Sequence, residues 1–392
     1  MSDSISVEMK EAAAAGDPVA LCRVMVATPS VNPILAAGGV GERAMADLTC
    51  SWLRDWGLET EIVEVEPGRY NVIGRLEGSG PSLLLNGHLD TVGVEGMTTA
   101  PFGAELVDDK VLGRGSCDMK GGVASILAAT RRLANGGPRP NLIVAFTADE
   151  EYASVGKAHL VKSGVRADMA VVCEPTSLTV MPAHKGFVWI EADFRGRAAH
   201  GSRPEIGVDA IRHAGLYLAA LDRYADDLKA RPAHPLLQYG SFHAGTIHGG
   251  SAESVYPEGC TLMLERRTMP GEAPGTVMEE FEAVLSELRT EEESLDGTLK
   301  MTLERPGTEV ATSSELVQGL LAAIDHHGIE ARVEGMTAWV DAAFLNESGV
   351  PAVCFGPGDI AQAHTEDEWI EAQQISSCAD VLESFARGLA AE

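Results

Sequence analysis

The sequence has no apolar run long enough to cross a lipid bilayer. Residues 1–17 carry acidic side chains and no apolar run, so we expect neither a signal peptide nor a transit peptide. The seven cysteines are scattered, and no two of them have the Cys-x-x-Cys spacing of a cysteine zinc site. These absences predict reduced thiols, a cytoplasmic location and no membrane partner.

Basic side chains are scarce relative to acidic ones. The chain has 30 Lys and Arg residues against 58 Asp and Glu residues, for a net charge of −28. This balance excludes nucleic acid and anionic membranes as expected partners. The acidic excess has two explanations, a solvated surface or carboxylates that converge on a cation, and composition alone does not separate them.

The pattern of the 392 residues predicts more than one domain, because single domains usually run to about 100–200 residues. In residues 1–183 and 307–392, short apolar strands alternate with helices, and several strands end in polar residues. That order is typical of an α/β sheet with a site at one edge. Residues 184–306 follow the order β-α-β-β-α-β of a ferredoxin-like α+β domain. We therefore predict an α/β domain with an α+β domain inserted into it.

Imidazoles and carboxylates follow several predicted strands, near the point where each strand ends. They are His88, Asp118, Glu150, Glu151, Glu174 and His364. Such nitrogen and oxygen ligands suit zinc or a similar divalent ion, and two ions bridged by one carboxylate would use five ligands. A water between the ions would have its pKa lowered toward about 7. Adjacent glutamates diverge, so one glutamate of the 150–151 pair would bind metal while the other acts as a general base.

His88 and Asp90 follow the apolar residues 83–85 and stand two apart, so in an extended chain their side chains point the same way. A carboxylate beside an imidazole can accept its spare N–H and leave the other nitrogen free for a metal. The alternative is a strand end with a histidine in the turn.

Five stretches resemble the M20 family of metallopeptidases and amidohydrolases, with its acetylornithine deacetylase and succinyl-diaminopimelate desuccinylase branches. They occur in the family's order and are residues 87–92 (GHLDTV), 113–122 (GRGSCDMKGG), 147–151 (TADEE), 173–176 (CEPT) and 363–368 (AHTEDE). Each stretch is weak alone, but five in order make the resemblance specific.

The resemblance implies a role for each of these residues. Asp118 would bridge two ions, and a non-proline cis peptide bond would follow it. His88 and Glu174 would complete one metal site. Glu151 and His364 would complete the other. Asp90 would orient His88, and Glu150 would be the general base.

The inserted domain also carries family-like segments. His200, in residues 199–202 (AHGS), resembles the histidine that reaches the partner subunit's site and stabilises the oxyanion; the alternative is an ordinary histidine near a helix. Arg267 resembles a clamp for a substrate carboxylate, or is a solvated arginine at a strand end. Ser254 stands where many relatives carry Asn, which puts a substrate contact there in doubt.

The resemblance therefore implies an aminopeptidase-like metal domain with an inserted lid domain that forms a homodimer. The expected cofactors are two divalent ions, zinc first, with cobalt or manganese as alternatives. The expected reaction is deacylation of an N-acyl amino acid, and the alternative is a dipeptidase or glutamate-type carboxypeptidase. A non-catalytic relative would have lost Glu150 or a metal ligand, and neither is lost. No feature supports a scaffold protein.

Overall fold

The computed structural model describes residues 5–390. The first four residues of the segment 1–17, for which we expected no signal or transit peptide, lie outside the described part. The chain divides into two compact units. The first unit contains Met1–Pro182, Val310–Glu334 and Phe344–Glu392, and the second contains Ala183–Glu309 and Gly335–Ala343. The predicted insertion, residues 184–306, lies within the second unit. The second unit also contains the short segment 335–343, which the prediction did not include.

The first unit begins with helices whose ends follow directly from the sequence. Helix α1 (Val7–Ala15) ends at Gly16, which has a φ of 96°, and α2 (Pro18–Val26) begins with a proline at its first position. The side chain of Asp17 accepts a hydrogen bond from a backbone N–H of α2. Helix α3 (Arg43–Asp55) buries its apolar face against β1 (Glu59–Glu66) and β2 (Arg69–Leu76).

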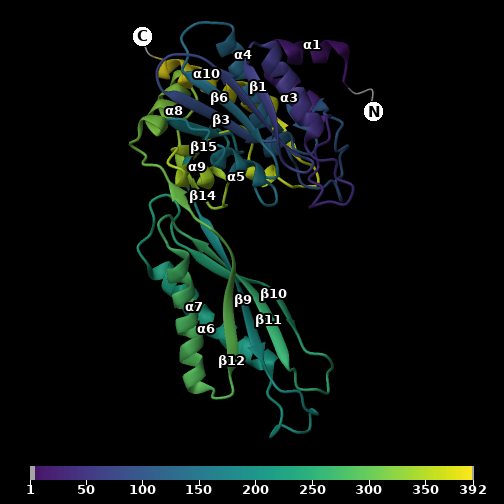
Figure 1. The fold of residues 1–392 in the computed structure, drawn as a ribbon, viewed down its shortest axis with the longest axis vertical. Helices are drawn as coiled ribbons and strands as arrows, with labels where there is room; N and C mark the ends of the chain where they lie inside the picture. The colour runs from purple at the N-terminus through teal and green to yellow at the C-terminus, as the bar shows by residue number, and fades with distance from the viewer. Residues whose placement is uncertain (1–4, 391–392) are drawn as a thin grey trace. The chain divides into compact units, whose positions relative to one another are not determined.

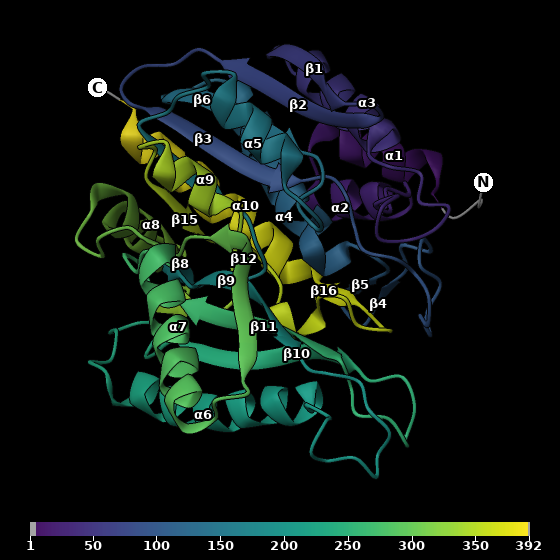
Figure 2. The same cartoon turned by 60° about the horizontal axis from the view of Figure 1, so that its bottom comes forward.

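The large sheet of the first unit brings the predicted strand ends to one edge. Its order is β1-β2-β6-β3-β7-β15-β8-β13, and β3 pairs in parallel with β6 and with β7. The strand bounds are β1 Glu59–Glu66, β2 Arg69–Leu76, β3 Ser82–His88, β6 Asn141–Thr147, β7 Met169–Val172, β8 Val180–His184, β13 Thr308–Glu309, β14 Val333–Met336 and β15 Ala352–Cys354. Figure 2 shows β1, β2, β6 and β3 side by side. Three of the five predicted metal ligands, His88, Glu151 and Glu174, lie at or just after the carboxyl ends of the parallel strands β3, β6 and β7.

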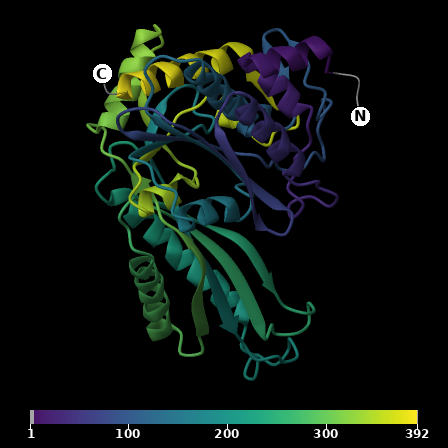
Figure 3. The same ribbon diagram turned by 45° about the horizontal axis from the view of Figure 1, so that its top comes forward.

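Helices cover both faces of this sheet (Figure 3). Helix α4 (Gly121–Ala134) packs very closely, because a Cβ on Gly122 would lie 2.2 Å from the backbone oxygen of Cys173. The other elements of this unit are α5 Val155–Lys162, α8 Glu315–His326, α9 Ala342–Glu347, α10 Ala372–Leu389, the short turns η1 Ser116–Lys120 and η2 Ile360–Gln362, and the small strands β4 Leu106–Val107, β5 Lys110–Leu112 and β16 Trp369–Glu371. Close packing by a glycine-rich helix start fixes the loop that carries Asp118.

The second unit has the predicted β-α-β-β-α-β order. Its sheet runs β10-β11-β9-β12, all antiparallel neighbours, and α6 and α7 lie on one face (Figure 1). The bounds are β9 Gly186–Arg195, α6 Ala210–Ala230, β10 Ser241–Gly249, β11 Gly259–Thr268, α7 Pro274–Glu291 and β12 Asp296–Arg305. The two units have separate buried cores.

Within residues 5–390, no helix combines the length and the apolar character that a bilayer span requires.

Candidate metal centre

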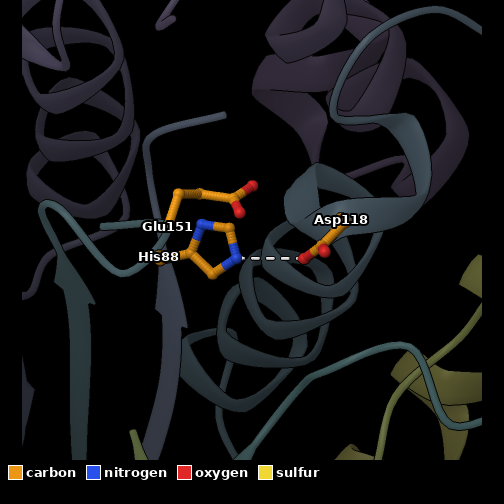
Figure 4. A group of neighbouring side chains, drawn as sticks. All are labelled: His88, Asp118 and Glu151. Carbon is orange, nitrogen blue, oxygen red and sulfur yellow. Dashed lines mark hydrogen bonds and ion pairs between the residues drawn. The ribbon is translucent and has the colours of Figure 1, made fainter. Parts of the chain in front are cut away.

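Four of the predicted ligands converge at the carboxyl edge of the large sheet. His88 Nε2 lies 3.0 Å from Asp118 Oδ1, and Figure 4 shows these two side chains with Glu151 beside them. His364 Nε2 lies 3.4 Å from Asp118 Oδ2 and 3.0 Å from Glu151 Oε2. The two oxygens of Asp118 therefore face two different imidazoles. This is the arrangement that a bridging carboxylate requires.

The fifth predicted ligand, Glu174, follows β7 and is buried. Its carboxylate and that of Glu150 place oxygens within 4.8 Å of each other. Ligand atoms of His88, Asp118 and Glu151 also lie within 4.8 Å of one another. The adjacent glutamates thus belong to different groups of candidate ligands: Glu151 lies with His88 and Asp118, and Glu150 lies with Glu174.

The loop that carries Asp118 is clamped by a residue whose role the sequence did not reveal. Glu368 is buried, and its Oε1 accepts hydrogen bonds from the backbone N–H of Cys117 at 2.9 Å and of Asp118 at 3.1 Å. Its Oε2 accepts from the backbone N–H of Gly115 at 2.9 Å and from Arg114 Nη1 at 2.8 Å. The peptide bond between Asp118 and Met119 is cis, as the family resemblance implied. One carboxylate therefore ties the Asp118 loop to the segment that carries His364.

Asp90 contacts His88 through its backbone and the turn of Glu150 through its carboxylate. The hydrogen bond of His88 Nδ1 is to the backbone oxygen of Asp90, at 3.0 Å, whereas the carboxylate Oδ1 lies 3.7 Å away. The Asp90 carboxylate instead accepts from the backbone N–H groups of Glu150 and Glu151, at 3.1 and 3.3 Å. It thereby holds the turn that presents the candidate base and one candidate ligand.

The charges at this site shift the pKa values of its members. Burial alone would lower the pKa of His88, but its hydrogen bond to Asp118 and the surrounding carboxylates raise it well above its usual value. Hydrogen bonds to Asp118 and Glu151 raise the pKa of His364 to about 10. Burial and the charge of Asp118 raise the pKa of Glu151 to about 7. A bound cation would compete with protons for these same ligand atoms, so metal binding is expected to depend on pH.

The donor set fits divalent ions. In the described part of the chain, Glu151 Oε1 is buried and has no hydrogen-bond partner. Such an oxygen carries a desolvation cost that a cation removes. Imidazole nitrogens and carboxylate oxygens without a thiolate are ligands for zinc and for related divalent ions.

The predicted site residues of the second unit do not cluster. His200 is exposed, its Nδ1 lies 2.8 Å from Ser202 Oγ, and its segment pairs with Val255. The backbone oxygen of Ser254 accepts from Gly201 N at 2.7 Å, so Ser254 lies beside His200. Arg267 lies near the other end of β11.

The strand register gives the separation. Gly259 pairs with Arg195 at the end of the sheet near His200, and Arg267 stands eight residues further along β11. At about 3.3 Å per residue, this separation is about 26 Å. Arg267 Nε donates to Glu265 at 2.7 Å, and its guanidinium lies 5.4 Å from the ring centre of Phe187. Arg267 therefore lies toward the opposite end of β11 from Gly259.

Comparisons with known proteins identify the family of this chain. The family model of Peptidase family M20/M25/M40 matches residues 84–388. The acetylornithine deacetylase of Myxococcus xanthus is 31% identical over 355 residues, which cover 88% of this chain and 87% of the relative. That of Photorhabdus laumondii is 30% identical over 378 residues, or 93% of this chain and 95% of the relative.

Solved structures share the fold. A tripeptidase from Staphylococcus aureus has a TM-score of 0.78 at 19% identity, covering 96% of this chain and 98% of that one. A dinuclear metal binding peptidase of the M20 family from Bacillus subtilis has a TM-score of 0.74 at 16% identity, with 96% and 99% covered. The fold and the sequence relatives together define a hydrolase. The chain belongs to the M20/M25/M40 peptidase family, so the predicted family and fold class are confirmed.

Proposed function

We propose that this hydrolase uses two divalent ions to remove the acyl group from an N-acyl amino acid. The observation that carries the proposal is the position of Asp118, whose two oxygens face His88 and His364. In the proposed centre, Asp118 is shared by both ions. His88 and Glu174 complete the coordination of one ion, and Glu151 and His364 complete that of the other. Zinc is the proposed ion, with cobalt and manganese as alternatives, because the donors are imidazole and carboxylate.

Glu150 is the proposed general base. Two divalent ions, when bound, activate water and polarise a substrate carbonyl. Glu150 would accept the proton that the attacking water releases and return it to the nitrogen of the leaving amine. Its backbone N–H is held by Asp90, and its carboxylate lies within 4.8 Å of that of Glu174, so the base stands at the edge of the ligand cluster.

A deacylase is favoured over a peptidase by the extent of the sequence likeness. The acetylornithine deacetylases match about nine-tenths of this chain at 30–31% identity, whereas the tripeptidase shares the fold at 19%. A dipeptidase or carboxypeptidase remains the second candidate because the same centre can cleave a peptide amide. In either case, we propose that Arg267 binds a substrate carboxylate and that Ser254 contacts substrate.

We also propose that the second unit forms a homodimer in which His200 serves the partner's site. Support comes from the family resemblance of the His200 segment and from the position of Arg267, about 26 Å along β11 from Gly259, which lies at the end of the sheet from which the His200 segment continues. In the partner's site, His200 would stabilise the oxyanion of the tetrahedral intermediate. A cytoplasmic location fits the cysteines, which are buried free thiols throughout the described residues.

The base is tested with Glu150→Gln. We expect this variant to keep its metal content and to lose turnover by a factor of about 10² or more. Glu347→Gln, at an exposed position on α9, is the matched control and should keep full turnover. Normal turnover of Glu150→Gln would remove Glu150 as the base.

The partner role of His200 is tested by coexpressing Glu150→Gln with His200→Ala. Each variant alone should be nearly inactive. Mixed dimers would contain one intact site, in which His200 from one chain meets Glu150 of the other, so activity should recover to about a quarter of the wild-type value for random pairing. Absence of any recovery would show that His200 does not act across the dimer.

The substrate class is tested with N-acetyl-, N-succinyl- and N-formyl-amino acids, dipeptides and tripeptides. Fastest hydrolysis of N-acetyl-L-ornithine would support the deacylase. Hydrolysis of peptides alone would replace it with the peptidase.

A further inference from the structure

A buried polar network lies behind the turn that carries Glu150 and Glu151. At its centre is Arg69, from the start of β2, whose side chain is 6% exposed. Its Nη2 pairs with Glu42 and with Asp149 Oδ1, the latter at 3.0 Å, and its Nη1 donates to Asn32 Oδ1 at 3.0 Å. None of these residues belongs to the proposed ligand set.

Asn32 continues the network toward the metal centre. Its Nδ2 donates to Asp90 Oδ2 at 2.8 Å and to Asp149 Oδ1 at 3.0 Å. One amide group therefore stands between two buried carboxylates and is oriented by Arg69 on its other side. Reversing this amide would place its oxygen against both carboxylates, so the hydrogen bond from Arg69 fixes which way Asn32 points.

Both carboxylates hold the same turn. Asp90 accepts from the backbone N–H of Glu150 and of Glu151. Asp149 has a φ of 65°, and its side chain also accepts from the backbone N–H of Ala153 at 3.2 Å. The backbone on either side of Glu150 is thus fixed through side chains that Arg69 and Asn32 hold.

We propose that Arg69 and Asn32 are positioning residues that orient Glu150 as base and Glu151 as ligand. This inference rests on the proposed function. It adds that the positions of the base and of one metal ligand are set by two residues, Arg69 and Asn32, that contact neither the base nor the metal site. A misplacement of about 1 Å at such a turn can lower turnover by a factor of about 10².

The composition of the network argues for positioning. Arg69 is one buried cation among the three carboxylates of Glu42, Asp90 and Asp149, and removing charges from water is costly. A well-packed apolar cluster of the same volume would often stabilise a fold as well or better. Apolar side chains, however, could not accept hydrogen bonds from the backbone N–H groups of Glu150 and Glu151. The hydrogen-bonding pattern is therefore the property that the network supplies to the centre.

The test compares Arg69→Lys with wild type. Lysine keeps the charge but cannot present two parallel N–H donors to Asn32 and Asp149. With N-acetyl-L-ornithine as probe, kcat should fall about 10- to 100-fold while KM changes less than about twofold, because substrate contacts are untouched. Equilibrium dialysis against limiting Zn²⁺ should show weakened binding of one of the two ions, the one assigned to Glu151 and His364.

Two further variants keep the test decisive. If Arg69→Lys does not fold, the double variant Arg69→Met/Glu42→Met removes Arg69 together with Glu42, so that Glu42 is not left as a buried carboxylate without a cation. Asp149 loses its ion pair with Arg69 but keeps its hydrogen bond from Asn32. Leu320→Ala, in the buried face of α8, is the control that lowers thermal stability without touching the network. The control should lose melting temperature and keep both kcat and Zn²⁺ binding.

The outcomes separate this inference from the proposed function. A lowered kcat with unchanged KM, together with weakened Zn²⁺ binding, supports positioning. Unchanged kcat and Zn²⁺ binding, with only the melting temperature lowered as in Leu320→Ala, would overturn it. Because Zn²⁺ binding is measured without substrate, a wild-type protein that binds two ions but hydrolyses only peptides would refute the deacylase and leave the positioning result intact.

Discussion

Replacing Glu368 with Gln should destabilise the first unit and weaken its metal binding. The Glu368 carboxylate accepts four hydrogen bonds, two on each oxygen, from Arg114 and from three backbone N–H groups of the loop that ends at Asp118. Glutamine keeps one carbonyl oxygen and presents an NH₂ group in place of the other. Whichever way this amide turns, two N–H donors meet another donor.

The magnitude follows from those two lost bonds. A hydrogen bond to a charged group contributes about 1.5–3 kcal/mol, so the loss should be about 3–6 kcal/mol. That is a large part of a typical free energy of unfolding of about 5–15 kcal/mol. Arg114 would keep its bonds to the backbone oxygens of Gly93 and Thr365 but would lose its carboxylate partner, which adds to the cost.

The assay is denaturant unfolding of the metal-free protein, followed by Zn²⁺ binding. Metal-free protein is needed because a bound ion would itself add stability. Glu366→Gln is the control: that glutamate is exposed, two residues away, and its change should stay within about 0.5 kcal/mol. A loss below about 1 kcal/mol for Glu368→Gln would refute the account of this carboxylate as the clamp of the Asp118 loop.

Two further predictions concern protons and metal. Burial lowers the pKa of His184 to about 4. Between pH 6.5 and pH 4, His184 is therefore protonated in the unfolded chain but stays neutral in the folded chain. The contribution of His184 to the free energy of unfolding should therefore be fully present above pH 6.5 and fall by about 3 kcal/mol toward pH 4. His184→Gln should flatten this part of the stability profile, and an unchanged slope would contradict a buried neutral histidine. Elemental analysis of purified protein should find about two divalent ions per chain, as five shared ligands require, and a chelator should remove activity that Zn²⁺ restores; one ion or none would contradict the dinuclear centre.

The sequence predicted the elements whose patterns are local. The alternation of strands and helices in the first unit and the β-α-β-β-α-β order of the second unit were both predicted from local patterns. Strand β8 and helix α5 were missed. Helix α5 has little amphipathic character, and β8 is a five-residue strand whose partners are distant in sequence. Short elements that depend on distant partners leave a weak local pattern.

The candidate site shows the same limit. The positions of His88 and Glu174 follow from strand ends, because parallel strands end at the same edge. The roles of Arg69 and Asn32 follow from contacts between β2 and a loop 37 residues earlier in the chain, which no periodicity records. Glu368 lies within a family-like stretch, so its position was available, but only the structure shows its four hydrogen bonds.

The structure also answers the question that composition left open about the acidic excess. Among residues 5–390, few Asp and Glu residues are buried, so most of the net charge of −28 belongs to the solvated surface. The buried carboxylates are different, because Asp118 and Glu151 face imidazoles while Asp90 and Asp149 face backbone N–H groups and Asn32. The two imidazoles lie 3.0–3.4 Å from the carboxylate oxygens of Asp118 and Glu151. Most of the acidic excess is therefore a property of the surface, and the buried set is the one to which we assign the proposed metal chemistry.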